Sequence, residues 1–248
     1  MKRTKIRITF IEPCLGTLPG DPQIYKEYIA TKNPNRTSEL VEAEVNSLVN
    51  DEETEEFEGR PVTTFARMTL EDGTRVPAIN GYVLKGMFKN ACSALRDCED
   101  TLSSTVTAYK KKIDQLVFVN MDRANPLSRI NLVDDSILVN GILPICERPL
   151  RASTPQGERV AISCSEEVPA GSTVEFEIAA LNDTMFALVF EWLDYGMFNG
   201  LGCWHNSGKG RFSYEVLDGD PRPDYVGAAV QAKKRGRKKK EETTEVAE

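Results

Sequence analysis

The chain has 248 residues, of which 40% are hydrophobic and 28% are charged, and this balance is typical of a globular protein that dissolves in water. Its formal net charge of −7 argues against a uniformly basic surface, although an acidic total does not exclude a local basic groove. Its six scattered cysteines include no CxxC pair and it has a single histidine, which excludes the usual spacing of a zinc site or a disulfide scaffold. We therefore expect no metal and no cofactor.

The sequence contains no apolar run that approaches the ~20 residues needed to span a bilayer. Its first ten residues are basic and then alternate between polar and apolar side chains, unlike the continuous apolar stretch of a signal peptide. We therefore expect a cytoplasmic protein without a membrane partner.

A strand is predicted at residues 5–10, because Ile6, Ile8 and Phe10 alternate with polar side chains. Residues 21–59 are polar, acidic and weakly periodic, which indicates an insertion that could carry a short helix near 38–48. Residues 63–70 and 75–79 flank Asp72-Gly73, a pair typical of a tight hairpin turn.

Apolar residues recur at helical spacing from just after Gly81 to Leu95, which predicts a helix. A second helical piece is expected at 102–113, and strands at 116–119 and 137–145. Two further strands, 160–164 and 174–179, flank a turn at 169–172. Asn182 or Asp183 is the expected cap of a helix, which leads into a glycine-rich loop at 200–210 and a strand at 211–216.

This order of elements predicts an α+β protein with a ferredoxin-like (RRM-like) βαββαβ core. We expect one such domain at residues 1–220, with insertions near 21–59 and 102–135. Residues 221–248 are rich in charge and poor in apolar side chains, so we expect them to be disordered.

Three stretches of this chain together resemble the RAMP superfamily, in particular the backbone subunits of type III CRISPR effector complexes. Residues 76–89 are similar to the family's Ile-Pro-Gly-Ser-Ser-Leu-Lys-Gly signature, with Asn80 at the family's proline, Tyr82 and Val83 at its serines, and Lys89 in place of an arginine. Residues 147–176 resemble a family hairpin with a Val-Pro-Ala-Gly-Thr turn, and residues 200–212 resemble the family's glycine-rich loop.

The resemblance implies a CRISPR-associated protein of antiviral defence that binds single-stranded RNA, in some members a guide RNA. It also implies a head-to-tail homo-oligomer, or assembly with other effector subunits. In such proteins the helix that corresponds to residues 82–95 lies along the guide RNA, and a hairpin acts as a thumb that separates nucleotides.

The candidate RNA-binding residues fall in three places. Lys85 and Lys89 lie on the helix after Gly81, whose N-terminus favours an anion, although a solvated helix face would look the same. Glycines in the 200–210 loop can bring backbone N–H groups close to a phosphate, unless the loop is only a tight connection with Trp204 in the core. The candidates are Lys85, Lys89, Arg148, Arg151, Trp204, Gly208, Lys209, Gly210 and Arg211, with Arg159 beside the arginines and Tyr82 as a second stacking residue.

Cleavage has two weak candidate residues, Asp21 and His205. Asp21 precedes Pro22, as a turn aspartate would, and the RAMP processing endonucleases place their histidine elsewhere in the fold. The basic run 233–240 could attract phosphates without reading sequence, or could only keep the chain soluble.

The sequence thus favours a single-stranded RNA binder. A metal-independent RAMP-type endoribonuclease, a RAMP-like protein repurposed for protein–protein assembly, and a single-stranded DNA binder remain as alternatives. The binding hypothesis depends on Lys85 and Lys209 lining one continuous trough.

Overall fold

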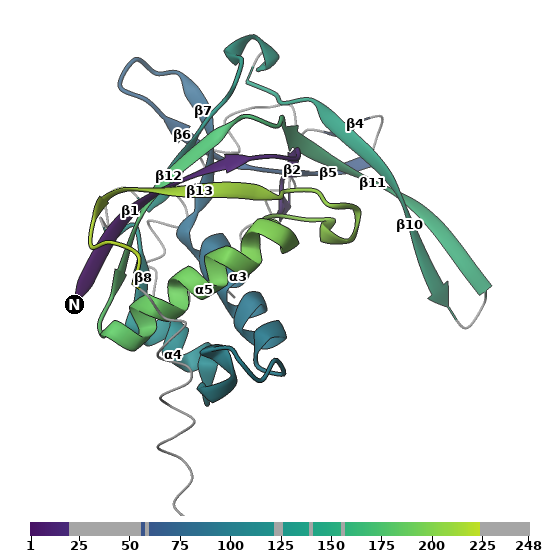
Figure 1. Ribbon diagram of the computed structural model, residues 1–248. Helices are drawn as coiled ribbons and strands as arrows, with labels where there is room; N and C mark the ends of the chain where they lie inside the picture. The colour runs from purple at the N-terminus through teal and green to yellow at the C-terminus, as the bar shows by residue number, and fades with distance from the viewer. Residues whose placement is uncertain (20–55, 58–59, 122–125, 139–140, 155–156, 224–248) are drawn as a thin grey trace, which may run out of the picture.

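The computed structural model of the chain describes residues 1–19, 56–57, 60–121, 126–138, 141–154 and 157–223. Within these residues the protein has an α+β fold with three α-helices and two sheets. The helices lie on one side of the larger sheet, and a long hairpin projects from the body (Figure 1).

The larger sheet has seven strands in the order β13–β1–β12–β9–β7–β6, and β8 also pairs with β12. Every pairing in this sheet is antiparallel. Its strands are β1 (Lys2–Phe10), β6 (Ala66–Thr69), β7 (Arg75–Asn80), β8 (Val117–Val119), β9 (Leu127–Asn131), β12 (Thr173–Ala180) and β13 (Phe212–Gly219).

The strand pattern at the N-terminus is confirmed by β1. Ile6 and Ile8 are buried and lie opposite Phe176 and Val174 of β12, so the apolar residues of the alternating pattern face the core. The turn at Asp72-Gly73 is also confirmed, because it joins β6 to β7 and Gly73 has a φ of 83°, which glycine adopts without steric cost.

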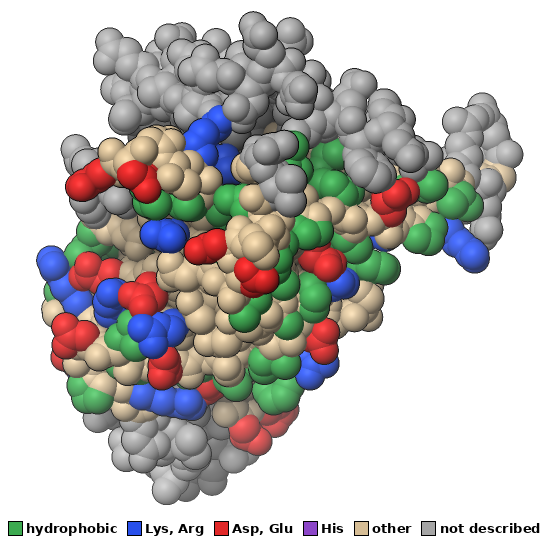
Figure 2. Space-filling view, turned by 90° about the horizontal axis from the view of Figure 1, so that it is seen from above, with side chains coloured by type: hydrophobic (Ala, Val, Ile, Leu, Met, Phe, Trp, Pro, Cys, Tyr) green, Lys and Arg blue, Asp and Glu red, His purple; other side chains and the backbone are tan. Residues whose placement is uncertain are grey.

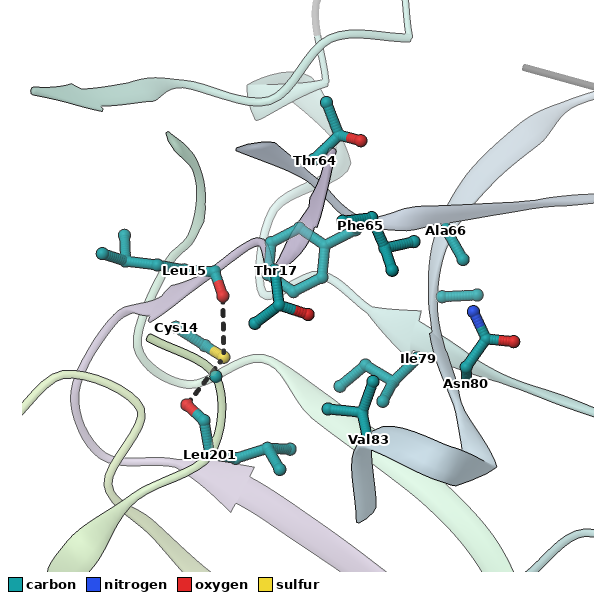
Figure 3. A pocket seen from close by; sticks show the side chains of 13 residues that line it. Cys14, Leu15, Thr17, Thr64, Phe65, Ala66, Ile79, Asn80, Val83 and Leu201 are labelled. Atoms are coloured by element: carbon teal, nitrogen blue, oxygen red, sulfur yellow. Dashed lines mark hydrogen bonds between the residues drawn. The ribbon is translucent and has the colours of Figure 1, made fainter. Parts of the chain in front are cut away.

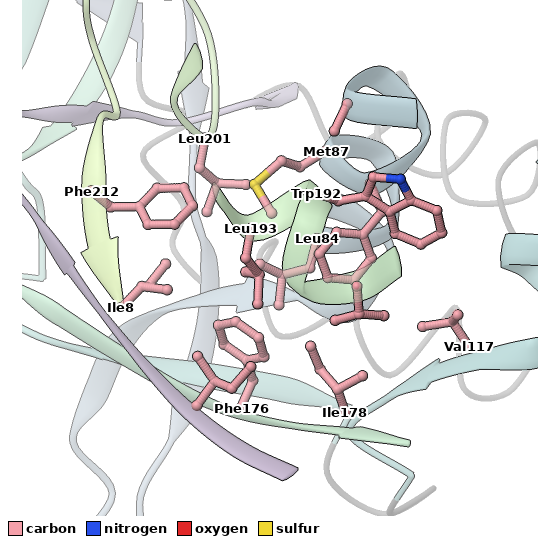
Figure 4. Packing of buried hydrophobic residues seen from close by; sticks show 14 of the residues in the cluster. Ile8, Leu84, Met87, Val117, Phe176, Ile178, Trp192, Leu193, Leu201 and Phe212 are labelled. Atoms are coloured by element: carbon pink, nitrogen blue, oxygen red, sulfur yellow. The ribbon is translucent and has the colours of Figure 1, made fainter. Parts of the chain in front are cut away.

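The helices are α3 (Gly81–Leu95), α4 (Tyr109–Leu116) and α5 (Asp183–Asn199). Helix α5 begins where the sequence predicts, because the Asn182 side chain accepts a hydrogen bond from the Met185 N–H at 2.7 Å. The core lies between α3, α5 and the sheet, where Leu84, Trp192 and Phe176 pack together (Figure 4).

The smaller sheet has six strands, and β10 and β11 form its long hairpin. Its order is β10–β11–β5–β3, with β2 paired to β11 and β4 paired to β5. Strand β11 is parallel to β5 and antiparallel to β10, so this sheet is mixed. The strands are β2 (Cys14–Leu15), β3 (Leu18–Pro19), β4 (Glu56–Phe57), β5 (Arg60–Thr64), β10 (Ile145–Thr154) and β11 (Gly157–Val168).

One predicted strand is wrong. In the described part of 137–145 the chain leaves a 3₁₀ turn, Asp135–Ile137, and becomes a strand only at Ile145, where β10 begins. Apolar residues at 137–145 gave the pattern of a strand, but a short apolar run does not show whether a partner strand is available.

The predicted insertion at 102–135 supplies part of the larger sheet. It contains the 3₁₀ turn Ser103–Thr105, helix α4 and strands β8 and β9. The helix considered at 38–48, most of the insertion at 21–59 and nearly all of the tail lie outside the described residues. No helix in the described part of the chain is long and apolar enough to cross a membrane.

Candidate nucleic-acid interface

The glycine-rich loop at 200–210 folds back against the segment that follows β1. The Leu201 N–H donates to the Gly210 carbonyl at 2.9 Å, and the Gly210 N–H donates to the Pro13 carbonyl at 2.8 Å. Gly210 has a φ of 74°, and a Cβ there would overlap the Leu201 carbonyl oxygen. The loop is therefore a tight connection from α5 to β13, and Gly210 is needed for its close packing.

Arg148 of β10 meets this loop through Trp204. The guanidinium of Arg148 lies over the Trp204 ring, 5.5 Å from its centroid, at a distance typical of a cation–π contact. Arg148 is only 9% exposed, and its buried Nε has no hydrogen-bond partner among the residues that the structure describes. Trp204 is 36% exposed, so it lies at the surface and is not a core residue.

Lys209 of the glycine-rich loop also lies near Arg148 and the base of the β10–β11 hairpin. Its ammonium forms an ion pair of 2.7 Å with the carboxylate of Glu167 on β11. Cys146 of β10 lies among these groups: burial and the Glu167 carboxylate raise the pKa of its thiol, while Lys209 and Arg148 act in the opposite direction. We call Arg148, Glu167, Trp204 and Lys209 the hairpin-base site.

Gly208 and Arg211 complete the loop next to this site. Gly208 ends a 3₁₀ turn, His205–Ser207, with a φ of 81°. Arg211 is exposed, and its carbonyl accepts hydrogen bonds from the N–H groups of Ile11 and Glu12 at 2.8 and 3.2 Å. The backbone of Arg211 thus ties the loop to the end of β1 while its side chain remains accessible.

Lys85 and Lys89 lie elsewhere, between α3 and α4. The Lys85 ammonium donates to the Asp114 carbonyl at 3.4 Å and lies over the Phe118 ring, and Lys89 pairs with the Asp114 carboxylate at 2.6 Å. Burial lowers the pKa of Lys85. Both lysines are therefore engaged by the helical layer.

Helix α3 separates Lys85 from the glycine-rich loop. Val83 lines a pocket together with Leu201 and Gly202 of that loop. Lys85 follows two residues later, about 200° further round the helix, and it contacts α4 and β8. In the described part of the chain Lys209 therefore lies with Arg148 and Trp204. Lys85 lies beside Asp114 and Phe118 instead.

The predicted arginine cluster is divided by the strand geometry. Successive side chains of a strand point to opposite faces, so Arg148 and Arg151 of β10 lie on different faces of the hairpin. Arg151 is exposed. The side chain of Arg159 lies outside the described ones.

Only one of the two candidate catalytic residues lies in the described part of the chain. His205 is half-buried and its Nδ1 lies 2.7 Å from the Asn199 carbonyl oxygen, while Asp21 lies outside the described residues. Among the described side chains, no group of three or more His, Cys, Asp or Glu residues could hold a metal ion.

The outer face of the larger sheet carries paired charges. Glu175 of β12 accepts from Lys5 and Arg7 at 2.7 Å each, and Arg7 also contacts Glu215 of β13 at 2.9 Å. These hydrogen bonds lower the pKa of Glu175. On the face shown in Figure 2, described basic and acidic side chains are likewise interspersed.

Two charged residues at the candidate interface, Glu167 and the neighbouring Glu166, were not among the candidates chosen from the sequence. Glu166 is fully buried and pairs with Arg67 of β6, whose side chain is 8% exposed. Both glutamates lie near the C-terminal end of β11. From the sequence, a charged residue in a strand is predicted to face solvent. No local pattern distinguishes a buried, paired carboxylate from an exposed one.

No protein-family model matches this chain, and no curated protein matches it. Among solved structures the chain is similar to one in a type IV-B CRISPR complex, with a TM-score of 0.43, 12% identity, and coverage of 90% of this chain and 96% of that one. It is also similar to a chain of a type III-B Cmr-beta complex bound to cognate target RNA, with a TM-score of 0.38, 11% identity, and coverage of 88% of this chain and 60% of that one.

The structure is thus similar to chains of a type IV-B and a type III-B CRISPR complex. Both TM-scores lie below 0.5, so neither similarity carries weight in assigning the function.

Proposed function

We propose that this chain binds single-stranded RNA at the hairpin-base site. The observation that carries the proposal is Arg148, a nine-tenths buried cation that lies against an exposed tryptophan and has an unpartnered Nε. A buried donor without a partner is costly, and a bound phosphate or base acceptor would satisfy it.

The other members of the site fit the same ligand. A base can stack on the exposed ring of Trp204, as bases do on aromatic side chains in single-strand binders. Lys209 has three N–H donors, so it keeps two of them for a phosphate after pairing with Glu167. The Arg211 side chain, exposed at the end of the loop, would add a further phosphate contact.

We also propose that the core is ferredoxin-like. Strands β13, β1, β12 and β8 lie in that order, each antiparallel to the next, and α3 and α5 are the two connecting helices. RRM domains of this topology bind RNA through aromatic residues on the open sheet face. Here that face carries the ion pairs of Lys5, Arg7 and Glu175, which favours the hairpin-base site instead.

The proposal extends to assembly along the strand. One Arg148–Trp204–Lys209 site can hold only a few nucleotides, and the chain as a whole is acidic. Copies joined head to tail would place successive sites along one RNA, and a heterologous interface of this kind forms open arrays. We therefore propose a cytoplasmic RNA-binding subunit of a CRISPR-like effector assembly. No described contact favours the endoribonuclease alternative.

The test is fluorescence anisotropy with a labelled 20-nucleotide RNA at low salt, using wild type, Arg148→Met, Lys209→Ala and Lys89→Ala. Arg148→Met keeps an apolar stem against Trp204 but removes the charge, and we expect it to lose about tenfold or more in affinity. Lys209→Ala should lower the slope of log affinity against log salt by about 0.7.

Lys89→Ala is the matched control, because it removes a cation on the other side of α3. We expect its affinity to stay within about twofold of wild type. Equal losses in Lys89→Ala and Arg148→Met, or wild-type binding by Arg148→Met, would contradict the proposed site. Equal affinity for DNA of the same sequence would assign the chain to single-stranded DNA as well, against the RNA proposal.

A further inference from the structure

A pocket lies beside the hairpin-base site, at the N-terminus of α3. It is bounded by the segment after β1, by the β5–β6 connection, by the end of β7 and by the glycine-rich loop. Figure 3 shows Cys14 and Leu15 on one side of this space and Ile79 and Asn80 on the other. Its empty space is about 290 Å³ when the part open to solvent is counted, and its enclosed part has room for about one water-sized group.

Asn80 gives this pocket an unsatisfied donor. It is the N-cap residue of the fifteen-residue helix α3, yet its side chain makes no capping hydrogen bond. It is 3% exposed, and no described group forms a hydrogen bond with its buried Nδ2. The N-terminus of α3 adds the positive end of a helix dipole at the same point. A ligand with a hydrogen-bond acceptor would therefore satisfy the Asn80 donor.

The walls of the pocket favour an uncharged acceptor. They are mostly apolar, with Leu18, Phe65, Ile79, Val83 and Leu201 among them, and the described part of the lining contains no Lys or Arg. Burial raises the pKa of the Cys14 thiol in the wall, because these surroundings disfavour a charge. A phosphate would enter here without a cation to neutralise it.

Two lining residues connect the pocket to the hairpin-base site. Leu201 and Gly202 belong to the same loop as Trp204 and Lys209. Gly202 has a φ of 91°, and a Cβ there would lie 2.7 Å from the Leu15 carbonyl oxygen. The loop is thus held close against β2, and one short segment contributes both to the pocket and to the proposed strand-binding surface.

We propose that this pocket accepts the carbonyl edge of an unstacked uracil from the bound strand, with Asn80 Nδ2 donating to the carbonyl oxygen. The carbonyl enters the enclosed part and the ring stays in the open part against the apolar walls. This inference rests on the proposed function. Adenine has no carbonyl group, and its acceptors are ring nitrogens that project less far into the enclosed part than a carbonyl oxygen does, so we expect the pocket to favour uracil over adenine.

The test compares labelled ten-nucleotide oligouridylate and oligoadenylate by fluorescence anisotropy, with wild type, Asn80→Leu, Asn80→Asp and Asn131→Leu. Wild type should bind oligouridylate about fivefold more tightly, the effect of one hydrogen bond. This preference runs against stacking on Trp204, which favours purines.

In Asn80→Leu the ratio of oligouridylate affinity to oligoadenylate affinity should fall to about 1. The thermal unfolding midpoint of this variant should equal or exceed that of wild type, because the change removes an unpartnered buried donor. Asn80→Asp keeps a residue that favours the N-cap but loses the donor, and it should lose the preference as well. Asn131→Leu makes the same change at an exposed position on β9 and should keep the wild-type ratio.

A wild-type ratio near 1, or a preference unchanged in both Asn80 variants, would overturn this inference while leaving RNA binding at the hairpin-base site intact. If neither oligonucleotide binds to wild type at low salt, the inference and the proposed function fail together.

Discussion

Trp204 is held in a backbone conformation that a bulky residue rarely adopts. Its φ is 63°, in the left-handed region, which costs a residue with a Cβ about 1–2 kcal/mol. In this strained conformation the ring is partly exposed and contacts Arg148. Strain of this kind often accompanies a binding site.

Replacing Trp204 with glycine should therefore separate stability from binding. We expect Trp204→Gly to have a higher thermal unfolding midpoint than Trp204→Ala, because both variants lose the ring but only glycine adopts positive φ freely. The glycine variant should lose about 5- to 100-fold in RNA affinity, the effect of one lost base–aromatic stack. Calorimetry and anisotropy measure the two quantities, and Trp204→Phe, which keeps a ring, should retain most of the binding.

The β10–β11 hairpin is anchored at its base by a buried ion pair between the two sheets. Arg67 of β6 donates to Glu166 of β11 at 3.1 Å and also to the Phe65 and Gly141 carbonyls at 3.2 Å each. Glu166 in turn accepts from the Phe65 N–H at 2.7 Å. Because a projecting two-stranded hairpin has little stability of its own, this anchor positions Arg148.

Breaking the anchor should destabilise the hairpin base. Arg67→Met leaves the Glu166 carboxylate buried without its cation, and we expect the free energy of unfolding to fall by about 3–5 kcal/mol. Amide hydrogen exchange in β11 should become faster in the same variant. The double variant Arg67→Met/Glu166→Gln removes the charge and keeps an acceptor for Phe65, so it should recover much of the loss. A single variant with unchanged stability and exchange would contradict this role.

At the scale of the whole molecule, the charge distribution limits how the proposed RNA binding can work. The net charge is −7, and the outer face of the larger sheet is occupied by ion pairs. If the proposed site binds RNA, the described cations that face the strand in each copy are the small group at the hairpin base. Strong binding should then require several copies on one RNA.

The number of bound copies should therefore rise with RNA length. Light scattering coupled to size-exclusion chromatography, with RNAs of 10 to 60 nucleotides, would measure the mass of each complex. We expect a steady increase for wild type and little complex with Arg148→Met. A fixed dimer at every length would instead indicate a closed interface between two copies.

Local patterns in the sequence were enough to place several elements. The alternation at Ile6 and Ile8, the Asp72-Gly73 turn and the Asn182 cap each depend on residues a few positions apart, and β1, the β6–β7 hairpin and α5 formed as predicted. The strand predicted at 137–145 failed because short apolar runs do not reveal whether a partner strand is available.

The sequence alone also identified candidate side chains for contacts with RNA, since Arg148 and Lys209 were chosen as cations and Trp204 as a stacking residue. Only the tertiary structure decided which of them meet. Lys209 pairs with Glu167, which is 42 residues away in the sequence, and Arg67 pairs with Glu166, which is 99 residues away. Lys85 instead contacts α4. Such pairings follow from how sheets and helices pack over long separations, and local periodicity carries no information about them.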